Sequence, residues 1–326
     1  MTIALPSKLK LRDGKRSLSW VSASYGQHPI DPEANRCSPG TYELDGEEAY
    51  SPVRYLPTFI LLYRARIPII FTGWVPSHRK SRQPLTISKC EYNSLRTLQN
   101  GYGNEAQCGR AIREFCARTG TPREAIFYTT KLKTNSGFAA TKAAIQRSLD
   151  KCSLGYIDLY LMHSPIGGPE KRRDCWKAIM EARAEGKIRS IGVSNYGVKH
   201  LQEMVDARVE LPVINQVDLH PFMTRTDIVA FCNEHDIALE AWAPLVRGLR
   251  FRHPSLRNLS KKYNKEPAQI LLRYSLQKGY IPLPKSSSRV RIESNIKVYD
   301  FELTSDEVAA LDALDEGMTV HLGRRL

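Results

Sequence analysis

The sequence of 326 residues lacks several patterns that mark common protein classes. Its seven cysteines are an odd number and include no C-x-x-C pair, so neither a disulfide framework nor a metal site is expected. Scattered reduced thiols, as in cytosolic proteins, are the simpler interpretation. The chain also has no G-x-G-x-x-G after an early strand and no P-loop lysine motif, which argues against a Rossmann domain and a P-loop nucleotide site.

Long apolar runs are absent as well. The most apolar stretch, 57–75, is interrupted by Arg64, Arg66 and Pro68, and charges at mid-depth make a membrane-spanning helix costly. The first fifteen residues contain basic side chains but no continuous apolar segment, so a secretory signal is not expected. We therefore predict a cytoplasmic protein without a membrane partner.

The net charge of +14 is the clearest compositional bias. A polyanion-binding protein is one explanation, but no stripe of Lys and Arg interleaved with aromatics and no zinc-finger or RNP-type motif is present. A solvated basic surface, or a field that helps to capture an anionic dinucleotide, accounts for the charge equally well. A basic nucleic-acid or membrane-surface protein stays an alternative that rests only on net charge and the apolar patch near Ile69, and we predict no nucleic-acid partner.

From about residue 125 the sequence alternates short β-rich runs with amphipathic segments, which is typical of βαβ units and a parallel sheet. The predicted strands are 126–130, 157–162, 188–193, 213–217, 238–242 and 280–283. The predicted helices are 104–118, 140–152, 173–185, 198–206, 226–234, 265–278 and 304–314. Thr304 and Glu307 can form a capping box, and Gly186 and Gly279 stand where helices end. Such a series of right-handed crossovers can close into an eight-stranded barrel.

Seven short motifs follow one another along this framework, near predicted strand ends. The first three are Tyr102 in Y-G-N-E, Lys131 in T-T-K-L and His163 in L-M-H-S-P. The others are Ser194 and Asn195, Asn215 and Gln216, W-A-P-L at 242–245, and P-K-S at 284–286. This ordered set resembles the aldo-keto reductases, enzymes that reduce carbonyls with NADPH. The resemblance spans residues 102 to about 318 and implies an α/β fold of the (β/α)8 TIM-barrel type.

Carbonyl reduction needs hydride delivered to carbon and a proton delivered to oxygen. The resemblance implies that Tyr102 is the general acid, that Lys131 tunes it by favouring the phenolate, and that His163 orients the carbonyl. Alone, each has a commoner explanation: a turn tyrosine, an exposed strand-end lysine and a hydrogen-bonded core histidine. Their joint placement at strand ends favours the catalytic interpretation.

The resemblance also implies residues for the nicotinamide half of NADP(H). Ser194, Asn195 and Gln216 would hydrogen-bond the carboxamide, and Trp242 would stack on the ring. Pro244 and Leu245 belong to the same cofactor-binding set. Taken singly, Trp242 is also compatible with a core aromatic and Gln216 with an ordinary satisfied amide.

The adenosine half falls on a later segment. By resemblance, Lys285, Ser286 and Arg291 would grip the 2′-phosphate, which favours NADP over NAD. Asn295 matches an adenine-contacting position, whereas Ser294 stands where the family often has Glu. A solvated basic loop is the alternative for this segment. We also expect the segment 243–255 to lie across the cofactor as a loop, with Arg247 and Arg250 near the pyrophosphate.

The N-terminal third departs from the family pattern. Residues 9–15 and 40–49 resemble its opening hairpin and first strand and helix, but 51–100 matches nothing and is either an insertion or translated non-coding sequence. Thr97 stands where the family has an Asp that pairs with the lysine. We predict one barrel domain, 1–326, with its first one or two β/α units disrupted or diverged.

The expected protein is a monomeric NADPH-dependent reductase of small-molecule aldehydes or ketones. The substituted position at Thr97 leaves a second possibility. This alternative is a catalytically impaired NADP-binding barrel, either a regulatory subunit or a defective gene product.

Overall fold

The computed structural model describes residues 69–71, 94–96, 104–286 and 288–319. All of them belong to one compact unit, Ser51–Leu326. The earliest elements are β1 (Ile69–Phe71) and β2 (Ser94–Arg96), which pair in parallel. Tyr102, Thr97 and most of the segment 51–100 lie outside the described residues, so the single-domain prediction and these two positions stay predictions.

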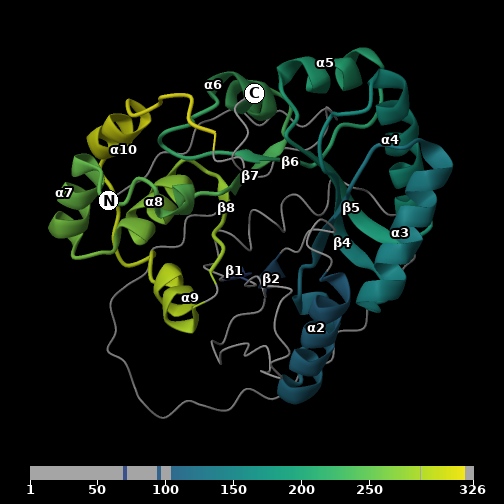
Figure 1. Cartoon of the computed structure of the whole chain (residues 1–326), viewed down its shortest axis with the longest axis horizontal. Coiled ribbons are helices and arrows are strands. Elements are labelled where there is room, and N and C mark those ends of the chain that lie inside the picture. Colours follow the sequence, from purple (N-terminus) through teal and green to yellow (C-terminus); the bar gives the residue numbers. More distant parts are fainter. Residues whose placement is uncertain (1–68, 72–93, 97–103, 287, 320–326) are drawn as a thin grey trace, which may run out of the picture. The chain divides into compact units, whose positions relative to one another are not determined.

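Six parallel strands form the main sheet, in the same order as in the sequence (Figure 1). They are β3 (Thr129–Leu132), β4 (Ile157–Met162), β5 (Ile188–Ser194), β6 (Ile214–Asp218), β7 (Ala238–Trp242) and β8 (Ile281–Leu283). The sheet curls into a half-barrel with helices on its outer side. The predicted strands are confirmed, although β3 begins later than expected. Ile126 closes a 3-10 turn, η3 (Arg123–Ala125), by donating to the carbonyl oxygen of Arg123.

Helices connect the strands. They are α2 (Glu105–Thr119), α3 (Phe138–Cys152), α4 (Pro169–Ala184), α5 (Val198–Asp206), α6 (Thr226–Glu234), α7 (Pro254–Tyr263), α8 (Pro267–Gln277), α9 (Arg289–Ile296) and α10 (Ser305–Asp312). In α3 the buried residues follow helical spacing, with Thr141, Ala144 and Ile145 on one face. Helices α2, α3 and α4 pack side by side (Figure 1). No helix in the described ranges has both the length and the apolar character that crossing a membrane requires.

Helix ends follow the sequence signals. Gly186 and Gly279 have φ of 73° and 79° just after α4 and α8, a left-handed conformation that glycine adopts without a steric penalty. The predicted capping box of α10 is confirmed, because Thr304 accepts from the backbone N–H of Glu307 and the Glu307 carboxylate accepts from that of Thr304. Two helices, α7 and α9, were not predicted.

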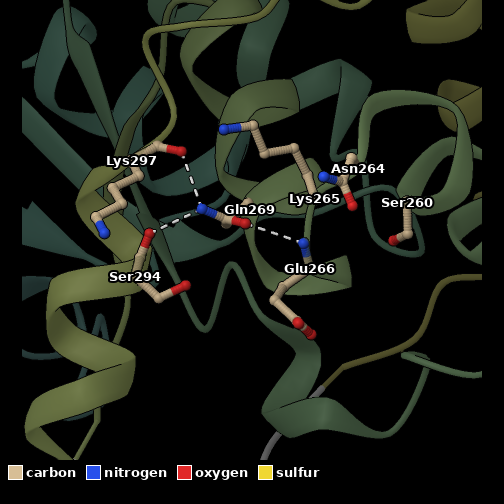
Figure 2. A pocket seen from close by; sticks show the side chains of 7 residues that line it. All are labelled: Ser260, Asn264, Lys265, Glu266, Gln269, Ser294 and Lys297. Atoms are coloured by element: carbon tan, nitrogen blue, oxygen red, sulfur yellow. Dashed lines mark hydrogen bonds between the residues drawn. The ribbon is translucent and has the colours of Figure 1, made fainter.

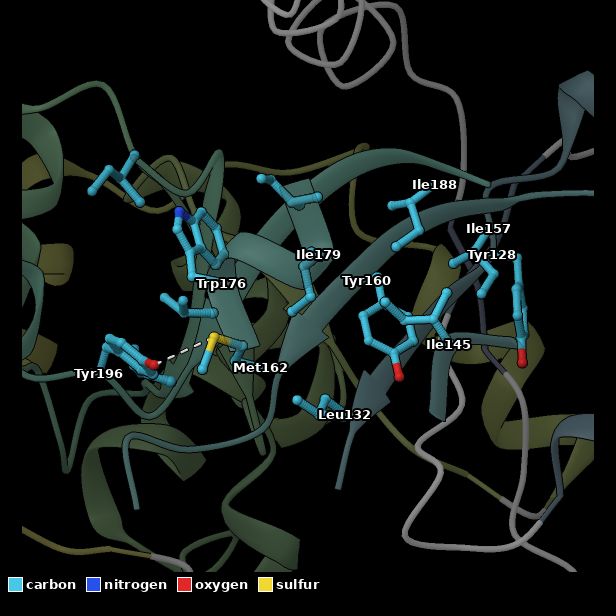
Figure 3. Packing of buried hydrophobic residues seen from close by; sticks show 14 of the residues in the cluster. Tyr128, Leu132, Ile145, Ile157, Tyr160, Met162, Trp176, Ile179, Ile188 and Tyr196 are labelled. Carbon is cyan, nitrogen blue, oxygen red and sulfur yellow. Dashed lines mark hydrogen bonds between the residues drawn. The ribbon is translucent and has the colours of Figure 1, made fainter. Parts of the chain in front are cut away.

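Both faces of the sheet are buried, as expected for parallel strands. On β4, Tyr160 and Met162 face the cluster that packs against α3 and α4 (Figure 3). Leu159 and Leu161 pack on the inner side with Ile214. Lys131 is the register partner of Leu161 and therefore points to the inner side. The strand framework thus carries a lysine into the barrel interior.

Candidate active site

The predicted site residues after position 103 gather at the C-terminal edge of the sheet. Lys131 is the penultimate residue of β3, His163 follows β4, Ser194 ends β5, Trp242 ends β7, and Lys285 lies two residues beyond β8. In parallel strands these ends share one edge, which is where active sites of eight-stranded α/β barrels lie. The predicted clustering at strand ends is confirmed for these residues.

Lys131 is buried in the centre of this cluster, with 2% of its surface exposed. Its Nζ donates to Oε1 of Gln216 at 2.5 Å and to Oγ of Ser194 at 3.2 Å. Burial lowers the pKa of Lys131 from 10.5 to about 7, and the charge of Glu240 opposes that shift. The lysine therefore titrates near neutral pH.

Strand register aligns three polar side chains beside this lysine. Ser194 pairs with Gln216 across β5 and β6, and Gln216 pairs with Glu240 across β6 and β7. The Nε2 of Gln216 donates to Oε2 of Glu240 at 2.6 Å, and Glu240 is completely buried. Sequence reasoning missed Glu240, although one signal was available: it is the single charged residue in the strand A-L-E-A-W.

Asn195 and His163 are linked at neighbouring strand ends. Asn195 donates from Nδ2 to the backbone oxygen of His163 at 2.9 Å and to Oγ of Ser194 at 3.2 Å. The backbone N–H of His163 donates to the carbonyl oxygen of Leu132 at 3.2 Å. The backbone of half-buried His163 is therefore held by bonds to residues from two other β/α units.

The segment after β7 has an unusual backbone. Ala243, Val246 and Arg247 have φ of 51°, 49° and 50°, a left-handed conformation that costs each non-glycine residue free energy. Pro244 is buried and Leu245 half-buried. The expected loop is partly helical, because it contains the 3-10 turn η4 (Val246–Gly248) and ends where α7 begins.

The two arginines of this segment have different surroundings. The Arg247 guanidinium lies 5.5 Å from the ring centroid of half-buried Trp242. Arg250 instead donates from Nε and Nη2 to Oε1 of Glu316, at 3.0 and 2.5 Å. Arg247 is therefore beside the residue predicted to stack on the nicotinamide, whereas Arg250 already has a carboxylate partner.

The segment after β8 combines exposed cations with a buried hydroxyl. Lys285 and Arg291 are exposed, Ser286 is buried, and Arg291 donates from Nε to Oγ of Ser286 at 3.3 Å. One turn of α9 further on, Asn295 is 5% exposed, and its Nδ2 has no hydrogen-bond partner among the described residues. A buried amide donor without a partner is costly unless a ligand completes it.

A polar pocket lies beside α9, between it and the α7–α8 connection (Figure 2). Gln269 of α8 crosses it: Nε2 donates to the backbone oxygens of Ser294 and Lys297, at 3.0 and 2.9 Å, and Oε1 accepts from the Glu266 backbone N–H at 2.9 Å. Each polar atom of the amide is thus bonded. The amide ties the C-terminal turn of α9, and with it Asn295, to the barrel.

Comparison with known proteins identifies the family to which this chain belongs. Residues 98–316 match the profile of the Aldo/keto reductase family. The chain belongs to the aldo/keto reductase family. This family comprises oxidoreductases that act on small-molecule carbonyl compounds.

Relatives of this aldo/keto reductase come from distant organisms. An uncharacterized oxidoreductase of Schizosaccharomyces pombe is 46% identical over 229 residues, 70% of this chain and 82% of the relative. An aldo-keto reductase of Mycolicibacterium vanbaalenii is 39% identical over 265 residues, 80% of this chain and 93% of the relative. The crystal structure of a Bombyx mori aldo-keto reductase in complex with NADP is 34% identical, with a TM-score of 0.69 over 78% of this chain and 91% of that one. The predicted (β/α)8 barrel class is confirmed by this likeness.

Proposed function

We propose that this aldo/keto reductase reduces an aldehyde or ketone to an alcohol with NADPH. Tyr102 is the general acid, Lys131 adjusts its acidity, and His163 orients the carbonyl oxygen. The observation that carries the proposal is the buried lysine at the C-terminal edge of a parallel half-barrel, among the polar side chains of Ser194 and Gln216.

The proton-transfer half of the reaction is supported by the lysine's environment. An ammonium next to a phenol favours the phenolate and brings proton release closer to neutral pH. Lys131 has a pKa of about 7, so a change of charge in this group falls within the working pH range. The protein's contribution is to keep this group dry and fixed at the strand ends.

The residues present fit an NADP-type cofactor. Asn295 has a buried donor that lacks a partner within the described part of the chain. Ser286 with Arg291 and Lys285 forms a hydroxyl flanked by cations, a set suited to a phosphate ester. The Bombyx mori relative, which was solved with NADP, supports the same assignment. Ser194, Asn195 and Gln216 would hold the carboxamide, with Trp242, Pro244 and Leu245 beside them. When bound, NADPH supplies the hydride.

The test is a fluorescence titration with NADPH, followed by its oxidation in the presence of a reactive aromatic aldehyde. The full chain is expected to bind NADPH and to turn it over. Tyr102→Phe, which keeps the ring and removes the acid, is expected to bind with similar affinity and to lose about 10²- to 10⁴-fold in kcat. Binding without turnover in the unmodified chain would contradict a reductase and favour an impaired NADP-binding barrel. Absence of binding would contradict both.

A further inference from the structure

Three side chains from three strands form one continuous chain of hydrogen bonds inside the barrel. Lys131 of β3 donates to Gln216 of β6 at 2.5 Å, and Gln216 donates to Glu240 of β7 at 2.6 Å. Their exposed fractions are 2%, 1% and 0%. A buried ammonium and a buried carboxylate are thus joined by one amide group.

The charges at the two ends fix the orientation of that amide. A lysine ammonium only donates, and an ionised carboxylate only accepts, so Oε1 of Gln216 must face Lys131 and Nε2 must face Glu240. An amide oxygen has a second lone pair and an amide nitrogen a second proton. Gln216 therefore keeps one acceptor and one donor position for a further amide, such as the carboxamide that the proposed function assigns to it.

The carboxylate also matters for the lysine's charge. Burying an ammonium without a nearby negative charge favours its neutral form. Among the described residues, Glu240 is the charged group whose field acts on the titration of Lys131. Further titratable side chains at this edge are Lys133 after β3, His163 after β4, Asp218 and His220 at the end of β6, and Lys285 after β8. The pKa shift of Lys131 has two causes, burial and the charge of Glu240. The neighbours that touch Nζ, Ser194 and Gln216, are uncharged.

We propose that Glu240 is the positioning residue of this site: its buried carboxylate, acting through the Gln216 amide, is the counter-charge that favours the protonated form of Lys131 and fixes the amide orientation. This inference rests on the proposed function for the role of Lys131 in proton transfer. It also explains how the chain retains a partner charge for the lysine when Thr97 stands at the family's Asp position. Glu240 acts through other side chains and does not itself take part in the chemistry.

The charge of Lys131 is measured directly, without relying on activity. The full chain is labelled with ¹³C at lysine Cε, and the NMR signal of Lys131 is assigned by its loss in Lys131→Met. The chemical shift of this signal is followed from about pH 5.5 to pH 9.5, which gives the midpoint of the Lys131 titration. Glu240→Gln, which is isosteric and uncharged, is expected to lower the midpoint by about one pH unit. An unchanged midpoint in folded Glu240→Gln overturns the proposal.

Glu105→Gln is the matched control. Glu105 is also buried and accepts a hydrogen bond from Thr130, the residue before Lys131 in β3, but on the outer face of the sheet. Burial and the charge of Glu240, rather than that of Glu105, cause the pKa shift of Lys131. The midpoint is expected to stay where it is in the unmodified chain, and a shift as large as that of Glu240→Gln would show a nonspecific effect and overturn the proposal.

Two further measurements separate this inference from the proposed function. If Glu240→Gln does not fold, the same titration is carried out on Gln216→Met, which removes the bridging amide and leaves both charges. A lower Lys131 midpoint in this variant supports the proposal, and an unchanged midpoint overturns it. If the unmodified chain shows no turnover, the proposed function fails while the lysine titration still decides the counter-charge. If the chain turns over, the alkaline limb of kcat/KM against pH is expected to move to lower pH in Glu240→Gln. Glu240→Asp, which keeps the charge, is expected to show a smaller shift.

Discussion

Asn195 and His163 are joined across the ends of β5 and β4, where Nδ2 of Asn195 donates to the backbone oxygen of His163 at 2.9 Å. Asn195 also has φ of 61°, a left-handed conformation that asparagine adopts more readily than most residues. One side chain and one backbone turn therefore fix the position of the residue proposed to orient the substrate.

We expect Asn195→Ala to reduce the free energy of unfolding by about 2 kcal/mol, through a lost hydrogen bond and backbone strain. It is also expected to weaken NADPH binding, because the same amide is proposed to bind the carboxamide. Urea denaturation and fluorescence titration measure the two effects. Asn264→Ala is the control, since Asn264 also has a left-handed φ, 51°, but stands at the C-cap of α7. It should cost about 1 kcal/mol of stability and leave NADPH affinity unchanged; an equal loss of affinity in both variants would contradict the assignment.

The pH dependence of stability should carry the signature of Lys131. Its pKa is about 7 in the folded chain and 10.5 without the fold, so between these pH values the unfolded chain binds more protons. The free energy of unfolding therefore rises with pH across this window, with a slope of at most about 1.4 kcal/mol per pH unit from this group. Lys131→Met removes the contribution. Urea denaturation at pH 7, 8 and 9 measures the free energy of unfolding of both proteins. The value for the unmodified chain minus that for the variant should increase with pH, and a constant difference would refute the expectation.

Cofactor preference should depend on Arg291. Its replacement by Ala is expected to weaken NADPH binding by roughly tenfold or more while NADH binding stays similar, because a charged hydrogen bond to the 2′-phosphate is lost. Arg289→Ala is the matched control on the same helix, since Arg289 pairs with Glu293 at 2.8 Å. Dissociation constants for both nucleotides measure the effect. A parallel loss for NADH and NADPH would argue against a 2′-phosphate role.

The two arginines after β7 should behave differently. Arg247 lies over Trp242, whereas Arg250 is bonded to Glu316. Arg247→Ala is expected to weaken NADPH binding several-fold, with a smaller effect at high salt because the contact to pyrophosphate is electrostatic. Arg250→Ala is expected to lower thermal stability and leave affinity nearly unchanged. NADPH titrations at low and high ionic strength measure the affinities. Equal losses of NADPH affinity in both variants would show that the two arginines do not differ in cofactor binding.

The order of strands and helices could be predicted because short β-rich runs and amphipathic segments alternate clearly after residue 125. The bounds of α5 and α6 agree with the prediction residue for residue. Helix α9 could not be found in this way, because Asn295 is its single fully buried residue and it has no apolar stripe. Helix α7 did carry signals, namely Pro254 in its first turn and lysines in its last, but the expected loop 243–255 extends over its first two residues.

The site was predictable only in part for a related reason. Motifs identify residues that lie close together in the sequence, and they placed Lys131, Ser194 and Gln216 at strand ends. Glu240 pairs with Gln216 across 24 positions of sequence, and the pairing depends on the register of β6 and β7. No local pattern encodes that register, so the contact emerged only from the fold. Tyr102 and Thr97 lie outside the described residues, and their roles stay predictions.

The residues proposed to hold the adenosine half of the cofactor, Lys285 to Asn295, come from one continuous segment that begins beyond β8 and is held to α8 by Gln269. Apart from Tyr102, those proposed for proton transfer and for the nicotinamide come from the stretch between β3 and the turn after β7. Nucleotide preference and carbonyl chemistry therefore reside in different segments of the sequence. Exchange of a single stretch between two such barrels can alter which dinucleotide is used while the buried lysine, glutamine and glutamate remain unchanged.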